Sequence, residues 1–566
     1  MEKRLGMVMV GLFLCIGMVF AQTKITGTVI SGEDGEPIIG ASVLIKGTTV
    51  GGTVTDIDGH FTLNTAEGTT IVISYVGMET QTLKAKNGMK VTLRPDQKLV
   101  LDEVVVTGMT STDKRLFSGA ATKIDAKDAK ISGMADISRS LEGRAAGVSV
   151  QNVSGTFGTA PKIRVRGATS IHGSSKPLWV VDGVIMEDVV DVSAEDLSSG
   201  DANTLISSAI AGLNSDDIES FQILKDGSAT SIYGARAMAG VIVITTKSGK
   251  GVAKGKPTIT FRSNLSFDVV STLPELQNEF GQGSGGSYDP YSGHSWGPKI
   301  ADLANDPTYG GNTDNAFTQK MGKRQGQYYV PQRAEAGLDP WATPKAYNNM
   351  KDFFDTGITW SNNVNVSQNL DKGNYSFSLG NSHQEGIIPT TGMDRYNAKM
   401  SAEVQLSPNW STGFNGNFVT SKIKKQSTAN SGVTATIYNA PVSYNMKGIP
   451  SHVEGDPYEQ NTYRQAWIDD AYWAVDNNLF TERSQRFFGN AFVKFTTKFG
   501  TDNHKLDVKY QLGDDAYTTN YSEIYGYGST MADTGDAIEY HYSINELNSL
   551  LTASYRWDIN KDWVFD

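Results

Sequence analysis

The sequence predicts a multidomain fold: an all-β sandwich, then a mixed α/β domain, then an incomplete antiparallel transmembrane β-barrel. Three observations predict this order. Short strand-like runs between turn residues fill residues 22–95, strand and helix signals mix over 111–250, and an alternation of apolar and polar residues begins at Pro257. A chain of 566 residues is too long for one compact core, so several domains are expected.

The N-terminus has the pattern of a secretory signal peptide. Lys3 and Arg4 form a charged start, an apolar stretch runs from Leu5 to Phe20, and Ala21 is a small residue at the cleavage position. We therefore expect residues 1–21 to be removed. The alternative, a membrane-anchor helix, is disfavoured because the stretch is short for a bilayer span. The single cysteine, Cys15, lies in this segment, so no disulfide is expected in the mature chain.

Several function classes receive no support. The net charge of -11 argues against a broad basic face for nucleic acid. The seven histidines are scattered, so no zinc site is predicted, and nothing indicates a cofactor. Gly293–Gly297 matches a nucleophile elbow around Ser295, but loop residues flank it. Gly281–Gly286 matches a dinucleotide fingerprint without the required strand and helix, so a flexible loop is expected there.

The first domain is predicted to be a β-sandwich because its strands are short and regularly spaced. The expected strands are Ile25–Ile30, Ala41–Lys46, Gly52–Asp56, His60–Leu63, Thr70–Tyr75 and Val91–Arg94. Asp56–Gly59 is interpreted as a hairpin turn, since His60 interrupts the spacing of a calcium loop. The series Gly27–Val29, Pro37–Ala41 and Asp56–Phe61 resembles the carboxypeptidase-regulatory-like domain, which implies a scaffold or docking module and not a peptidase.

The second domain, residues 111–250, shows one helix signal among strands. Ser132 is placed to cap a helix that runs to about Ala146 and ends at Gly147. Strands are expected at Ile163–Arg166, Leu178–Val181, Ser220–Leu224 and Val241–Thr246, followed by a linker at Lys247–Gly251. The last strand is nearly all β-branched, as a buried strand is.

The third region, residues 257–566, alternates strictly. From Tyr396 to Leu406, for example, every second residue is apolar and those between are polar. Tight turns such as Asp371–Gly373 are followed by long polar connections, expected at Ser421–Ser484 and Gly513–Asn548, a pattern typical of outer-membrane barrels. The region holds roughly ten strands, whereas plugged barrels have about 22. We therefore expect a truncated or split chain.

A seven-residue segment joins the first two domains, within the linker 96–110. It consists of Asp102, Glu103, Val104, Val105, Val106, Thr107 and Gly108. Local sequence alone favours a linker or an edge strand, but its place before the α/β domain makes it resemble a TonB box, which a periplasmic energy-transducing protein captures. The physical basis is β-augmentation, in which an extended, unpaired strand adds to a partner's sheet, and valines favour that conformation.

The α/β domain carries an ordered series of motifs between Leu141 and Lys247. The residues of these motifs with expected roles are Arg144, Arg164, Arg166, Gly167, Asp182, Gly183, Lys225, Asp226, Tyr233, Gly234 and Arg236. The series resembles the plug domain of SusC/RagA-type TonB-dependent transporters, and Ser292–Pro298 resembles a further segment of that family. Gly227 and Met238 depart from the usual motif residues, and the insert Asp191–Leu213 lengthens one loop.

This resemblance implies active import across the outer membrane, with the N-terminal domain in the periplasm. The implied partners are TonB with its ExbB/ExbD motor and a SusD-like surface lipoprotein that acts as a lid; the implied substrates are oligosaccharides or oligopeptides. The plug arginines Arg164, Arg166 and Arg236 are expected either to pair with wall carboxylates or to remain solvated. Two alternatives stay open: a non-transporting receptor or adhesin on the same scaffold, and an exported hydrolase using Ser295.

Three aromatic residues are candidates for substrate contact. Tyr288, Tyr291 and Trp296 lie in a loop-like segment and have faces suited to stacking on sugars. The competing interpretation is that these residues anchor their loops.

Overall fold

A computed structural model shows the fold of two compact units, of which the first carries strands β1–β7 and the second carries β10–β29. The structure describes residues 24–32, 35–46, 52–75, 78–94, 104–108, 111–114, 117, 119–129, 137–151, 157, 162–167, 176–186, 207, 210, 212–427, 432–464, 468–500, 503–559 and 563–565. The predicted signal peptide, Asp102, Glu103 and Ser132 lie outside these residues.

The first unit is a β-sandwich of two sheets, with strand orders β4-β1-β7 and β3-β2-β5-β6. Its strands are β1 (Lys24–Ser31), β2 (Ser42–Ile45), β3 (Gly52–Val54), β4 (His60–Asn64), β5 (Thr70–Ser74), β6 (Gln81–Lys84) and β7 (Met89–Leu93). The inward residues of both sheets, among them Val29, Val43 and Ile71, form one core. Strand β6 was not predicted from the sequence, because Leu83 is the only apolar residue among its polar ones.

The plug of the second unit is built on a five-stranded sheet with the order β10-β15-β16-β13-β14. The strands are β10 (Ala121–Asp125), β13 (Leu178–Val181), β14 (Val184–Met186), β15 (Ile218–Leu224) and β16 (Val241–Thr246), and β11 (Val148–Gln151) pairs with β12 (Lys162–Val165) outside that sheet. Strand β16 is buried on both faces, since Ile242 and Ile244 enter one apolar cluster and Val241 and Val243 another. This burial explains its β-branched sequence.

The predicted helix up to Ala146 is wrong in its described part. Only Ser138–Leu141 forms a 3₁₀ turn, and Glu142 is already extended with ψ 123°. Gly143 follows with φ 67°, a conformation that ends a right-handed helix. Ile137 and Leu141 still share one apolar cluster, as expected.

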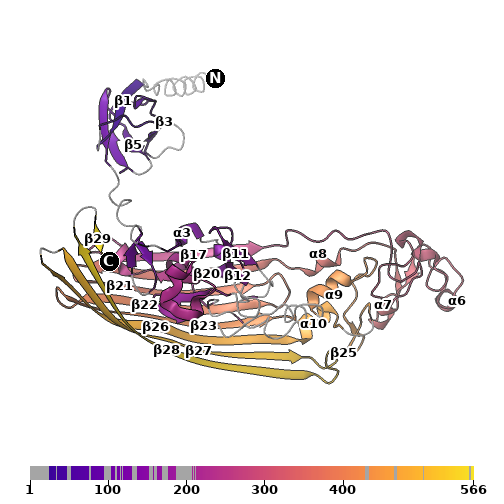
Figure 1. Ribbon diagram of the computed structural model, residues 1–566. Coiled ribbons are helices and arrows are strands. Elements are labelled where there is room, and N and C mark those ends of the chain that lie inside the picture. Colours follow the sequence, from indigo (N-terminus) through magenta and orange to yellow (C-terminus); the bar gives the residue numbers. More distant parts are fainter. Residues whose placement is uncertain are drawn as a thin grey trace, which may run out of the picture. The chain divides into compact units, whose positions relative to one another are not determined.

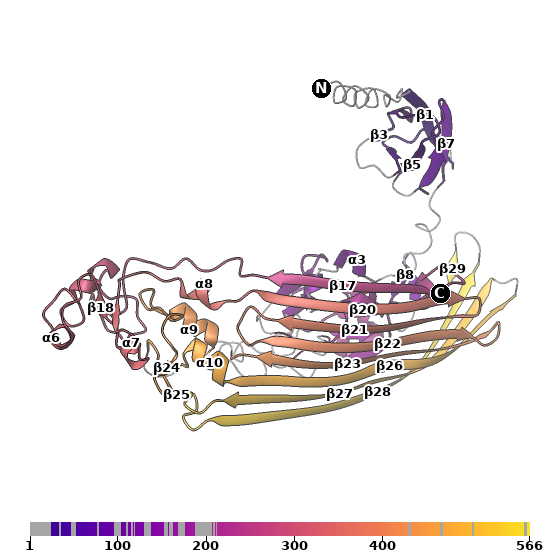
Figure 2. The same cartoon turned by 180° about the vertical axis from the view of Figure 1, so that it is seen from behind.

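The largest element is a nine-stranded antiparallel sheet, part of a barrel, in which neighbours in sequence are neighbours in space (Figure 1, Figure 2). Its strands are β17 (Thr258–Asp268), β20 (Gly357–Leu370), β21 (Gly373–Glu385), β22 (Gly392–Gln405), β23 (Trp410–Lys425), β26 (Leu479–Phe499), β27 (His504–Tyr525), β28 (Asp536–Asp558) and β29 (Val564–Phe565). Figure 2 shows the sheet curving along its whole length.

The two faces of this sheet reverse the usual rule of burial. On β22, Tyr396 and Met400 are 57% and 51% exposed, whereas the alternate residues Asn397 and Lys399 are 8% and 3% exposed. The polar residues face the plug, and the apolar ones face outward. An extensive exposed apolar face is stable only against lipid or another apolar surface.

Of the two long connections expected between strands, one differs from the expectation. The connection expected at Gly513–Asn548 is short, because β27 continues to Tyr525 and β28 starts at Asp536. Residues 426–478 form a long connection, as expected, and residues 269–356 form another. The described residues of both connections share one apolar cluster that includes Leu303, Phe353, Ile437 and Tyr463. No helix in the described part of the chain is long and apolar enough to cross a membrane.

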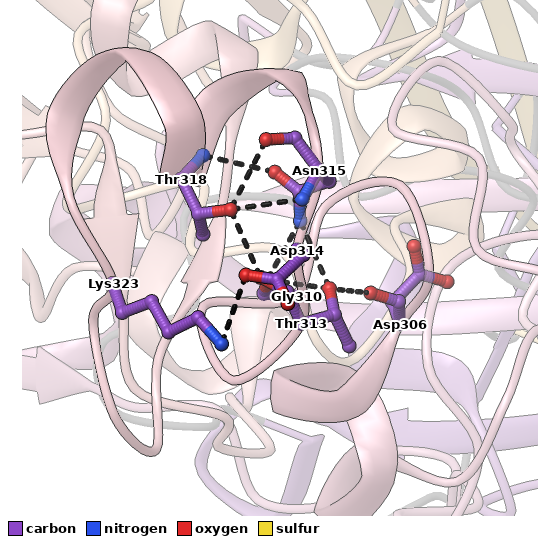
Figure 3. Close-up of polar contacts among 7 residues, drawn as sticks. All are labelled: Asp306, Gly310, Thr313, Asp314, Asn315, Thr318 and Lys323. Atoms are coloured by element: carbon purple, nitrogen blue, oxygen red, sulfur yellow. Dashed lines mark hydrogen bonds and ion pairs between the residues drawn. The ribbon is translucent and has the colours of Figure 1, made fainter.

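The long connections contain short elements held by local hydrogen bonds. These are α6 (Ala316–Met321), α7 (Pro331–Glu335), α8 (Asn349–Phe353), α9 (Val433–Asn439), α10 (Ala471–Asn477), β18 (Tyr328–Tyr329), β19 (Trp341–Ala342), β24 (His452–Val453) and β25 (Asp456–Gln460). Around α6, Asn315 accepts from the Thr318 amide at 3.0 Å and donates to the Gly310 carbonyl at 2.8 Å (Figure 3). Lys323 pairs with Asp314 at 2.9 Å (Figure 3). The first bond satisfies a free amide at the start of α6, and the other two hold the loop around that start.

Candidate functional site: the plug, its wall and the 104–108 segment

The segment expected to be an unpaired strand is paired and partly buried. Residues Val104–Val106 form β8, which pairs with β9 (Ser111–Asp113). Val105 is 2% exposed and lies in the apolar cluster of Val180 and Val243. The amide of Val106 donates to the Gln222 side chain at 3.3 Å. The expectation of an unpaired strand is therefore wrong for this conformation, because burying a valine on the plug stabilises the segment in place.

Tyr233 and Gly183 fix the end of the same segment. The Tyr233 hydroxyl donates to the Thr107 carbonyl, and burial raises the pKa of Tyr233 well above its usual value, which keeps the donor protonated. A Cβ on Gly183 would lie 2.5 Å from the Gly108 carbonyl oxygen, so only glycine allows this approach. The Gly183 carbonyl also accepts from Gln511 of β27 at 3.2 Å. We call the nine-stranded sheet the wall. Continuous contacts thus connect the 104–108 segment to the plug and the plug to the wall.

Several other motif residues shape the plug itself. Asp182 adopts φ 50° and accepts from the Thr246 amide at 2.9 Å and the Thr246 hydroxyl at 2.6 Å, which ties the β13–β14 turn to β16. Asp226 accepts from the amides of Ala229 and Ala120 at 2.9 and 2.8 Å, and these bonds lower the pKa of Asp226. The side chains of both aspartates thus accept hydrogen bonds from backbone amides.

The remaining motif residues hold turns together. Lys225 donates to the Ala146 carbonyl at 2.6 Å, and Arg144 donates to the Asp128 carbonyl. Gly167 and Gly234 have φ 90° and 65°, which L side chains rarely adopt. The bonds of Lys225 and Arg144 therefore lie within the plug.

One of the three plug arginines pairs with the wall. Arg236 reaches Glu546 of β28 at 2.5 Å. Arg164 and Arg166 are exposed, and within the described residues neither forms an ion pair. In a further ion pair the wall supplies the cation and the plug supplies the anion: Arg262 of β17 lies 2.9 Å from Asp216 of the plug. The sequence does not predict this pair, because pairing depends on which wall strand lies beside the plug.

The wall also contains two buried ion pairs that were not predicted from the sequence. Lys425 and Glu482 are 2.7 Å apart, and Glu482 accepts from the amide of Ser207 in the plug at 2.9 Å. Arg486 binds Asp515 through two nitrogens at 2.7 and 2.5 Å, and its guanidinium touches the Met186 sulfur at 4.0 Å. A charged residue at an inward position of an alternating strand is the sequence signal for such sites.

The plug contributes a buried acid of its own. Asp217 accepts from Asn397 of β22 at 3.0 Å, and burial raises the pKa of Asp217. In the long connection 426–478, Asp470 caps α10, and burial raises the pKa of Asp470 to about 7. Both carboxyls are therefore easier to protonate than ordinary aspartates.

The substrate-contact candidates do not form one surface. Tyr288 is 7% exposed and packs edge-on against Tyr309 and Tyr328, so it anchors its loop and cannot stack on a sugar. Tyr291 is half-buried and donates to Glu335 at 2.5 Å. Trp296 alone is exposed, stacked on Phe280 at 6.0 Å.

The glycine-rich segment Gly281–Gly286 is not the flexible loop expected. Gln282 is buried and its side chain donates to the carbonyls of Pro290, Ser292 and Tyr463 at 2.8 to 3.0 Å. A single buried amide with three partners fixes this stretch in the loop core.

Gly249 marks the junction of plug and wall, where the sequence suggested only a linker. A Cβ there would lie 2.4 Å from the Tyr375 carbonyl and 2.5 Å from the Gln368 carbonyl, which are rigid strand atoms. We expect Gly249→Ala to destabilise the protein by about 1–3 kcal/mol, since overpacking against backbone has few ways to relax. Urea unfolding in detergent measures this change. Gly251→Ala is the matched control, because its Cβ meets nothing within 4 Å; equal effects would contradict the assignment.

Comparison with known proteins gives consistent matches. Residues 25–106 match the CarboxypepD_reg-like domain and residues 113–241 match the TonB-dependent Receptor Plug Domain. The TonB-dependent receptor SusC of Bacteroides thetaiotaomicron is 32% identical over 411 residues, 72% of this chain and 34% of that protein. The TonB-dependent receptor P26 of Formosa agariphila is 31% identical over 404 residues, 71% of this chain and 35% of that protein.

Among solved structures, the RagAB peptide importer in its open-open state has the same fold. The TM-score is 0.58 at 21% identity, over 81% of this chain and 47% of that one. The chain spans about a third of the length of the curated relatives SusC and P26.

A plug seated against a curved sheet of long strands with an apolar outer face defines the class, an outer-membrane TonB-dependent receptor. This class is non-enzymatic, so the hydrolase interpretation of Ser295 is wrong. Within the class, the chain belongs to the SusC/RagA type.

Proposed function

We propose that the protein imports oligosaccharides or oligopeptides across the outer membrane, with energy delivered by TonB and its ExbB/ExbD motor. One observation carries this proposal: the 104–108 segment is attached to the plug by contacts that a pull from the periplasm would load together. The Tyr233–Thr107 hydrogen bond, the close approach of Gly183 and the burial of Val105 all lie at this attachment. Force along β8 is thereby directed to the sheet of the plug.

A SusD-like surface lipoprotein is the proposed second partner. The similarity to the RagAB peptide importer supports a two-protein assembly, and connection 269–356 with the described part of 426–478 offers a folded surface at one end of the wall. We further propose that the plug motif residues that shape its turns keep it removable as one body, because their bonds are internal to the plug.

Uptake in cells tests the function. Fluorescent oligosaccharides and oligopeptides are added to cells with the gene intact, with the gene deleted and with TonB deleted. We expect accumulation of one substrate class only when both genes are present, and surface binding without accumulation when TonB is absent. A receptor or adhesin would bind a probe at the surface of the intact strain without accumulating any of the probes. That result would overturn the proposal of import.

A further inference from the structure

Three cations project from the outer face of the wall, where two strands meet. On β23, Ile423 and Lys425 are buried toward the plug, so the alternate residues Lys422 and Lys424 face outward and are exposed. On β26, Glu482 is buried and Arg483 faces outward. We call Lys422, Lys424 and Arg483 the rim cluster.

The strand register brings the rim cluster together. Lys422 is the direct cross-strand partner of Arg483, and Lys424 lies two residues further along the same face. Direct partners have Cβ atoms about 5 Å apart, and residues two apart on a strand are separated by about 7 Å. One phosphate group is small enough to contact all three side chains.

The rim cluster stands at the edge of the apolar outer face. On the same strands, the outward pair Thr420 and Gln485 separates the rim cluster from the exposed outward pair Phe418 and Phe487. On its other side, β23 ends at Lys425 and the long connection 426–478 begins, whereas a tight turn at 407–409 closes the opposite end of β23. Long connections of outer-membrane barrels face the cell exterior. The cluster therefore lies where the outer leaflet places its headgroups.

The rim cluster is not held by ion pairs within the described residues. None of its three members forms a salt bridge there. Asp394 is the cross-strand partner of Lys422 on β22, but it is bound to His383 at 2.6 Å. Like charges opposite one another destabilise a sheet, so an anion bound between them stabilises this arrangement.

We propose that Lys422, Lys424 and Arg483 bind the phosphate of a phosphorylated lipid in the outer leaflet, whose acyl chains lie along Phe418 and Phe487. The guanidinium of Arg483 fits phosphate oxygens in a bidentate manner, and the two ammonium groups add point charges. A lipid is the occupant rather than a free anion because the apolar outer face begins at Phe418 and Phe487, one cross-strand pair beyond Thr420 and Gln485, where the acyl chains of a lipid with its phosphate at the rim cluster would lie. The site is independent of whether the protein transports.

Binding of lipid A to the purified protein in detergent tests this site. Three probes are compared: bis-phosphorylated lipid A, dephosphorylated lipid A and inorganic phosphate as a competitor. We expect the wild-type protein to bind the phosphorylated lipid, and the variant Lys422→Gln/Lys424→Gln/Arg483→Gln to bind it roughly 100-fold more weakly, from about 1 kcal/mol per cation. Native mass spectrometry counts the bound lipids.

Lys320→Gln/Lys351→Gln/Lys372→Gln is the control, because these three exposed lysines carry the same charge elsewhere and it should bind as the wild type does. All rim residues are exposed, so both variants should fold, which heat-dependent gel mobility verifies. Equal loss in the control would mean that general charge attracts the lipid, and unchanged binding by the rim variant would exclude the site. Equal binding of the dephosphorylated lipid, or displacement by inorganic phosphate, would also overturn the proposal.

Discussion

Replacing Val105 with proline is expected to reduce uptake of the cognate substrate to the level of a TonB deletion. Proline removes the backbone donor of the residue and disrupts strand pairing, so β-augmentation by TonB loses its central hydrogen bonds. The measurement is accumulation of the fluorescent substrate in cells that carry equal amounts of protein in the outer membrane. Unchanged uptake would mean that residues 102–108 are not the TonB box.

A matched variant is needed because Val105 also packs on the plug. Val180→Ala loosens the same apolar cluster but leaves residues 102–108 unaltered. If both variants lose uptake equally, the loss comes from the plug packing. If only Val105→Pro loses it, capture of the segment is the affected step. A peptide of residues 102–108 carrying the same proline should then also fail to bind purified TonB.

Removing Asp515 is expected to have the largest effect on stability. Its partner Arg486 has a side chain only 8% exposed, held between Met186 and Tyr517. Asp515→Ala leaves this guanidinium buried without its carboxylate, which costs about 3–5 kcal/mol. Urea unfolding in detergent measures the free energy of unfolding.

Two further variants separate the ion pair from its surroundings. Arg486→Met combined with Asp515→Leu should recover much of the loss, because an apolar pair needs no compensating charge. Asp558→Ala removes the partner of Arg556 in an exposed pair, and we expect a change of less than about 1 kcal/mol. A small effect of Asp515→Ala, similar to that of Asp558→Ala, would show that water or another group satisfies Arg486.

The loop interpretation shows where sequence patterns mislead. Residues 513–525 and 536–548 looked like a polar loop, yet they extend β27 and β28. In a wall that faces a polar interior and rises beyond the lipid, both faces of a strand carry polar residues. Composition then does not mark where the strand ends, and only pairing with a neighbour does.

The sequence predicts the alternating strands, their tight turns, six of the seven strands of the sandwich and the motif order of the plug. Each of these depends on a short period or on local turn chemistry, which neighbouring residues specify. The burial of Val105, the anchoring role of Tyr288 and the pairing of the inward charges follow only from the tertiary structure. These outcomes depend on contacts between residues far apart in the sequence, such as Arg236 and Glu546. Strand register and the position of the plug against the wall decide which of these residues meet.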